Sequence, residues 1–256
     1  MDEETNNFKS LYNLNKPQVI WKNIEADLET PVSALIKLSK NKKYSFLLES
    51  VEGGITRGRY SAIGVNPDLI WQCKNGKSEL YHSEINSNNL ISKSNDPLSS
   101  LKNLINSTKI NLPKDLPPLS AGLFGYLGYD MVKYFEDIHL NDNDPLELPE
   151  TILIRPSLIC IFDRLKDEFM LVTPIWPKKG VSSSQAWSKA QDRLNIAIKE
   201  LNEGLTHSNL PLKPNTFTEF QADTNFKKEE YYNIVDKAKN FILEGDIYQV
   251  VLSQRF

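Results

Sequence analysis

Hydrophobic and polar residues alternate along the chain in short runs, which are separated by glycine, proline or asparagine. Such alternation is typical of β-strands with one buried face, and apolar residues at helical spacing indicate amphipathic helices between them. The strands are expected at 19–21, 44–50, 59–64, 69–74, 77–81, 157–163 and 168–173, and the helices at 30–40, 96–112, 182–204 and 228–244. This order predicts an α+β fold, with antiparallel β-sheets flanked by helices.

Several boundaries carry residues with a specific backbone role. Asn75-Gly76, between two alternating runs, is a strong signal for a two-residue hairpin turn. Thr30-Pro31 and Asp96-Pro97 each fit an N-cap followed by the first helical position. Residues 82–95 are rich in serine and asparagine and have no periodicity, so a surface loop is expected there.

Glycines recur at three-residue spacing at Gly122, Gly125 and Gly128. A phosphate-binding loop needs a different glycine pattern and a lysine after it. The spacing therefore favours close packing of this backbone against a neighbouring element.

The apolar pattern also divides the chain. Residues 1–15 are polar and are interpreted as a loose leader, and residues 16–204 carry the main set of expected strands and helices. Residues 205–225 contain prolines and many polar side chains, which is typical of a linker. Residues 226–256 begin with a helix that ends at Gly245, and a β-rich run from Ile247 onward predicts a final strand.

The stretch from Ser45 to Gly64 carries the most specific candidate chemistry. A strand ends at Glu49 and Ser50, and a glycine-bearing connection leads into the next strand. A carboxylate and a hydroxyl at a strand end can together receive the α-ammonium group of an amino acid. The alternative is structural: Glu49 is solvated, and Ser50 ties down the turn through its own backbone.

Composition and charge exclude several classes of protein. The 256 residues are 40% hydrophobic and 25% charged, as in ordinary globular proteins, and a net charge of -3 gives no general attraction to nucleic acid or anionic lipid. Cys73 and Cys160 have no metal-ligand spacing, and the three histidines stand alone in segments expected to be polar loops. No secretory signal or long apolar segment occurs, so a cytoplasmic protein is expected.

Four strings, in order, resemble component I of anthranilate synthase, a chorismate-using enzyme of tryptophan biosynthesis. They are LLESVEGG (47–54), GRYSAIG (58–64), GYDMVKYFE (128–136) and GDIYQVVLSQRF (245–256). The resemblance implies that 16–204 is the N-terminal domain of that family and that 226–256 begins its chorismate-binding domain. It also implies that Leu48, Glu49 and Ser50 form part of a feedback site for L-tryptophan.

The same resemblance implies a reaction and its partners. Chorismate is aminated and loses pyruvate to give anthranilate, with Mg²⁺ as cofactor and ammonia from a glutamine amidotransferase subunit. In the family, the catalytic residues, the metal ligands and a proline-tyrosine part of the tryptophan pocket lie beyond the last matched string, so this chain is expected to be a catalytically incomplete N-terminal part. Two alternatives stay open: the related aminodeoxychorismate synthase component I of folate synthesis, and a non-catalytic amino-acid-binding module.

Overall fold

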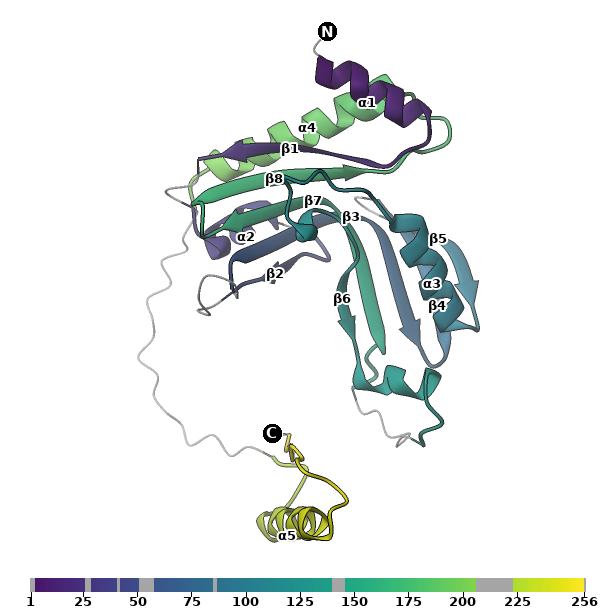
Figure 1. Cartoon of the computed structure of the whole chain (residues 1–256), viewed down its shortest axis with the longest axis vertical. Helices are drawn as coiled ribbons and strands as arrows, with labels where there is room; N and C mark the ends of the chain where they lie inside the picture. The colour runs from purple at the N-terminus through teal and green to yellow at the C-terminus, as the bar shows by residue number, and fades with distance from the viewer. Residues whose placement is uncertain are drawn as a thin grey trace. The chain divides into compact units, whose positions relative to one another are not determined.

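The computed structural model describes residues 3–25, 29–40, 42–50, 58–84, 87–139, 146–205 and 223–255. The chain divides into two compact units, Met1–Thr206 and His207–Phe256 (Figure 1). The division falls inside the expected linker, of which residues 206–222 lie outside the described residues. No helix among the described residues is both long and apolar enough to cross a lipid bilayer.

One antiparallel sheet organises the first unit. Its two longest strands, β3 and β7, pair along most of their length and form its middle (Figure 1). At the end of the β3–β7 pair that contains Tyr60 and Asp163, the sheet continues through β2 on one side and through β8 and β1 on the other. At the opposite end it continues through β4 and β5 on one side and through β6 on the other. The strands are β1 (Gln18–Ile24), β2 (Phe46–Leu48), β3 (Tyr60–Lys74), β4 (Lys77–Glu84), β5 (Ser87–Ser94), β6 (Phe124–Leu127), β7 (Thr151–Asp163) and β8 (Glu168–Ile175).

The helices begin where the sequence places capping residues. Thr30, Asp96 and Ser182 each accept a hydrogen bond from the backbone N–H three residues later, which satisfies a donor that the first helical turn leaves free. The helices are α1 (Glu3–Asn13), α2 (Pro31–Leu38), α3 (Pro97–Thr108), α4 (Ser183–Asn202) and α5 (Lys228–Glu244), with short 3₁₀ helices η1 (Pro118–Ser120) and η2 (Tyr129–Tyr134).

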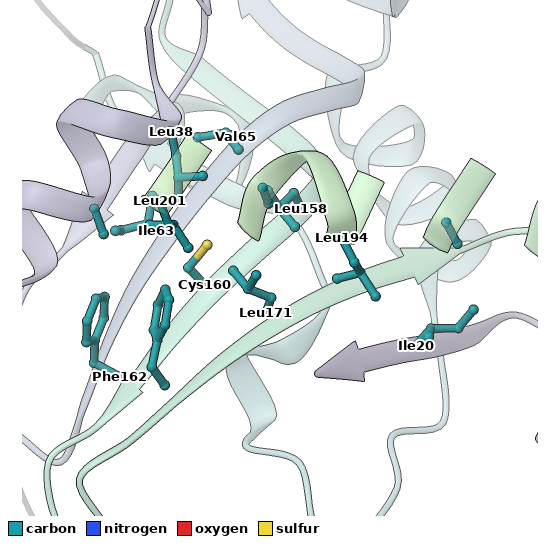
Figure 2. Packing of buried hydrophobic residues seen from close by; sticks show 14 of the residues in the cluster. Ile20, Leu38, Ile63, Val65, Leu158, Cys160, Phe162, Leu171, Leu194 and Leu201 are labelled. Atoms are coloured by element: carbon teal, nitrogen blue, oxygen red, sulfur yellow. The ribbon is translucent and has the colours of Figure 1, made fainter. Parts of the chain in front are cut away.

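The core lies on both faces of this sheet. The largest cluster lies between the sheet and helices α1, α2 and α4, and Figure 2 shows side chains from β3, β7 and β8 meeting Leu194 and Leu201 of α4. Cys160 is fully buried there, as a small apolar residue would be. The opposite face is covered by residues around 110–124, and α3 with η2 covers the β3–β4 end.

Two expectations for the first unit are wrong. Residues 3–13 form helix α1, whose Phe8 and Tyr12 are buried against α4, so this segment is not a loose leader. Residues 87–94 form strand β5, which pairs with β4, although they were expected to be a loop. Both segments are polar in overall composition, and tertiary partners supply the pairing or burial that composition does not reveal.

The expected glycine packing is confirmed at two positions. A Cβ atom at Gly125 would stand 1.9 Å from the carbonyl oxygen of Ile152, and one at Gly128 would stand 2.8 Å from that of Glu150. Gly122 has no such close neighbour, but its φ of 140° favours glycine. The Asn75-Gly76 turn is also confirmed, because both residues have positive φ, at 51° and 73°.

The second unit contains α5 and an extended tail. Gly245 ends the helix at a φ of 83°, as expected for a glycine C-cap. The strand expected from Ile247 is absent: residues 247–255 form no strand in the described structure. A strand needs a hydrogen-bonding partner, and among the described residues of this unit the backbone of 247–255 bonds only to Phe241 of α5 and to Asn225.

Candidate functional site

The short strand β2 is held in place by aromatic packing. The Phe46 ring lies directly over Gly64 in β3, where any Cβ atom would come within 2.2 Å of the ring. The same ring stacks on Phe124 of β6, with 4.8 Å between ring centroids. Phe46 pairs with Gly64 in register, and Leu48 pairs with Ala62. This packing fixes the position of β2 on the sheet, and therefore the position of Glu49 and Ser50, which follow its last residue.

The three residues expected to bind an amino acid lie together at this end of the hairpin. Leu48 is half exposed, and the Glu49 carboxylate is 4.0 Å from the Arg164 guanidinium in the β7–β8 turn. The Ser50 hydroxyl donates to the Tyr60 carbonyl oxygen at 2.7 Å. Ser50 therefore stabilises the hairpin, as in the structural alternative, but its hydroxyl bonds to the backbone of the opposite strand β3 and not to its own backbone. The connection 51–57 lies outside the described residues.

An ion pair clamps the hairpin end to the β7–β8 turn. Arg59 donates from Nε and Nη2 to the two oxygens of Asp163, at 2.8 and 2.6 Å, and Asp163 is buried. The Arg164 N–H donates to the Arg59 carbonyl oxygen at 3.1 Å. The hydrogen bonds from Arg59 hold the pKa of Asp163 below its usual value, although burial opposes the shift. The clamp thereby fixes the backbone beside Ser50.

Asp163→Asn is expected to lower stability at neutral pH, and the loss should shrink in acid. A carboxyl group whose pKa is depressed by folding stabilises the fold above its usual pKa of 3.8, and this contribution disappears as the pH falls through the lowered value. Thermal unfolding between pH 7 and pH 2 measures the difference from wild type. Asp192→Asn, at an exposed position of α4, is the matched control. A difference that stays constant with pH would contradict the assignment.

The hairpin end can accept an ammonium group. The Ser50 hydroxyl gives its proton to the Tyr60 carbonyl oxygen, and no described residue donates to its lone pairs, which can therefore accept a hydrogen bond. The Glu49 side chain is 37% exposed and has only a long ion pair with Arg164 among the described residues, so a ligand can reach it. A hydroxyl acceptor next to a reachable carboxylate suits an α-ammonium group, which donates up to three hydrogen bonds.

A second polar cluster connects η2 to the sheet. Glu150 accepts hydrogen bonds from Tyr134, at 2.8 Å, from Lys133 and from the thiol of Cys73, at 3.3 Å. Although burial opposes it, these donors hold the pKa of Glu150 below its usual value, and burial raises the pKa of Cys73 to about 12. A thiol with so high a pKa is not a nucleophile at neutral pH. The role of this cluster is to position η2.

The described residues do not fit a bound magnesium ion. Among them, no group of three or more His, Cys, Asp or Glu side chains lies close enough to hold a metal. His82 lies in strand β4 beside the carbonyl of Asp68, not in a loop as expected. His139 belongs to no such group, and His207 lies outside the described residues.

Sequence reasoning located the hairpin end but missed the residues that hold it. Arg59 and Asp163 are 104 positions apart, and nothing in the local pattern around either residue marks a partner. The Cys73–Glu150 contact spans 77 positions in the same way. Only the pairing of β3 with β7 brings these side chains together.

Comparison with known proteins gives consistent matches along the chain. The profile of the family described as chorismate binding enzyme matches residues 44–256. Anthranilate synthase component 1 of Cereibacter sphaeroides is 39% identical over 254 residues, which are 97% of this chain and 50% of that protein. The protein of the same name from Aquifex aeolicus is 33% identical, over 93% of this chain and 47% of its own length. The chain thus spans about half the length of these relatives.

A solved structure shares the fold. The crystal structure of anthranilate synthase component I from Streptococcus pneumoniae matches with a TM-score of 0.52 and 23% identity, over 90% of this chain and 47% of that one. The likeness supports the expected α+β architecture of antiparallel sheet and flanking helices. The family profile covers far more than half of the residues. The chain therefore belongs to the family of chorismate binding enzymes.

Proposed function

We propose that this chain is the N-terminal part of the large subunit of an anthranilate synthase. The enzyme would convert chorismate and ammonia to anthranilate and pyruvate, in tryptophan biosynthesis. The observation that carries the proposal is the 39% identity, over 97% of this chain, to a protein named anthranilate synthase component 1. Because the chain spans about half of that relative, the chemistry is assigned to the complete subunit.

The role proposed for the hairpin end is recognition of L-tryptophan as a feedback inhibitor. Glu49 and Ser50 would receive the α-ammonium group, and the half-exposed Leu48 would contact an apolar part of the ligand. The clamp between Arg59 and Asp163 supports this role, because it fixes the backbone next to Tyr60, whose carbonyl oxygen accepts the hydrogen bond from Ser50. Binding at this site would therefore need little rearrangement of the hairpin.

Partners and cofactor follow from the proposed reaction. Ammonia would come from a glutamine amidotransferase subunit, and the substrate would be chorismate. Mg²⁺ would be the cofactor, and its ligands would lie outside the residues that the structure describes. A cytoplasmic location also stays a prediction.

A chimeric subunit tests the proposal. Residues 1–256 joined to the C-terminal half of the Cereibacter sphaeroides relative should produce fluorescent anthranilate from chorismate and an ammonium salt. Ser50→Phe in this chimera should weaken inhibition by L-tryptophan about tenfold or more, since it removes a hydrogen bond to a charged group. Activity without tryptophan should stay close to that of the unmodified chimera.

Two controls make this test decisive. The intact relative shows that the assay works, and Ser92→Phe places the same ring on the exposed strand β5, where tryptophan inhibition should not change. A folded chimera that makes no anthranilate, although the intact relative does, would argue against the proposal. Equal inhibition of the Ser50→Phe and unmodified chimeras would refute the tryptophan site.

A further inference from the structure

A cavity of about 290 Å³ lies away from the hairpin end. Its lining comes from segments far apart in sequence: the α1–β1 connection, β4, the end of α3, β7 and the end of β8. The residues are Asn15, Pro17, His82, Ser107, Arg155, Trp176, Pro177 and Lys178. This volume is just below the range for pockets that hold drug-sized ligands, about 300 to 1,000 Å³, so it suits a small molecule or a single small group.

The lining is rich in hydrogen-bond donors and carries positive charge. None of the described lining residues is acidic, and two of them, Arg155 and Lys178, are cations. The nearby carboxylate of Asp68 accepts two hydrogen bonds from Arg155, both at 2.7 Å. Lys178 is 3.7 Å from the same carboxylate, beyond hydrogen-bond distance. Two cations therefore share one negative charge, and the ammonium group of Lys178 keeps donors to offer.

Trp176 provides an independent indication of a ligand. Its side chain is only 8% exposed, one face of its ring is covered by the Arg155 guanidinium at 3.9 Å, and its indole N–H has no partner among the described residues. A buried donor without a partner is rare, because it loses its hydrogen bond to water and gains none in return.

We propose that this cavity binds the carboxylate or phosphate group of a small molecule. The oxyanion would accept hydrogen bonds from Lys178 and the Trp176 indole, and the ring of His82 offers a further polar contact at the same cavity. None of these residues belongs to the hairpin end, so the proposal does not depend on the tryptophan site. It assigns a function to His82, which sequence reasoning treated as an ordinary exposed histidine.

Titration of the ¹⁵N-labelled 256-residue chain tests the site. Inorganic phosphate and succinate are added separately at constant ionic strength, and the indole N–H resonances of the four tryptophans are followed. Saturable movement of the Trp176 resonance is expected with at least one of the two anions, and the stronger one identifies phosphate or carboxylate as the preferred group. The absence of saturable movement with both would overturn the proposal.

Variants separate the site from general attraction to lysines. Lys178→Gln should weaken binding about tenfold or more, because one charge-assisted hydrogen bond is lost. Lys179→Gln removes the same charge from the next residue, which is exposed and outside the lining, and should bind as wild type does. Equal affinity in both lysine variants would refute the site. Trp176→Phe should also bind more weakly. If this variant does not fold, the comparison of Lys178→Gln with Lys179→Gln still tests the site.

Discussion

Leu194→Ala is expected to lower the free energy of unfolding by about 2–5 kcal/mol. Leu194 lies in α4, is fully buried, and belongs to the cluster between the helices and the sheet (Figure 2). Truncation removes its buried methyl groups and leaves a cavity that the long strands β7 and β8 cannot easily close. Chemical denaturation, followed by circular dichroism, measures the loss.

The control for this prediction lies on the same helix. Ile196 is 56% exposed, so Ile196→Ala changes a similar side chain without opening a cavity, and its effect should stay within about 0.5 kcal/mol. Helix propensity favours alanine at both positions and therefore cannot explain a loss at Leu194. Similar losses in the two variants would show that α4 does not pack on the sheet as described.

Gly125→Ala is expected to destabilise the fold by about 3 kcal/mol, at the upper end of overpacking costs. The new Cβ atom would stand 1.9 Å from the carbonyl oxygen of Ile152 and 3.1 Å from the Cα atom of Leu153. Both contacts are with backbone, so relief requires β6 to move away from β7 and to weaken their pairing. The φ of 155° adds strain for a residue with a side chain.

Gly204→Ala provides the comparison, because nothing lies within 4 Å of the position that its Cβ would occupy. Its effect on the free energy of unfolding should be within about 0.5 kcal/mol. Hydrogen exchange should also show faster opening of β6 amides in Gly125→Ala than in wild type. Stability unchanged in Gly125→Ala would mean that β6 does not lie as close to β7 as described.

Local chemistry made much of the fold predictable. Capping residues such as Thr30 and Ser182 act through hydrogen bonds three residues away, and the Asn75-Gly76 turn depends on the backbone freedom of two adjacent residues. The same holds for the end of α5 at Gly245. These signals act within a few residues, so the sequence alone reveals them.

The errors occurred where structure depends on a distant partner. The polar strand β5 forms because β4 is beside it, and α1 is ordered because α4 buries Phe8 and Tyr12. The apolar run from Ile247 shows the reverse case: its residues favour a strand, but the described part of its unit supplies no neighbouring strand. Propensity is a weak preference, and pairing or burial overrides it.

The sequence by itself determined the type and place of most strands and helices, most of the caps and turns, and the position of Leu48, Glu49 and Ser50 at a strand end. Tertiary structure alone decided two other features: the Arg59–Asp163 clamp at the hairpin end, and the separate cavity that gathers Lys178, Trp176 and His82. The physical reason is distance along the chain. Caps and turns form between neighbouring residues, whereas a clamp or a cavity exists only after the pairing of β3 with β7 has brought remote segments together.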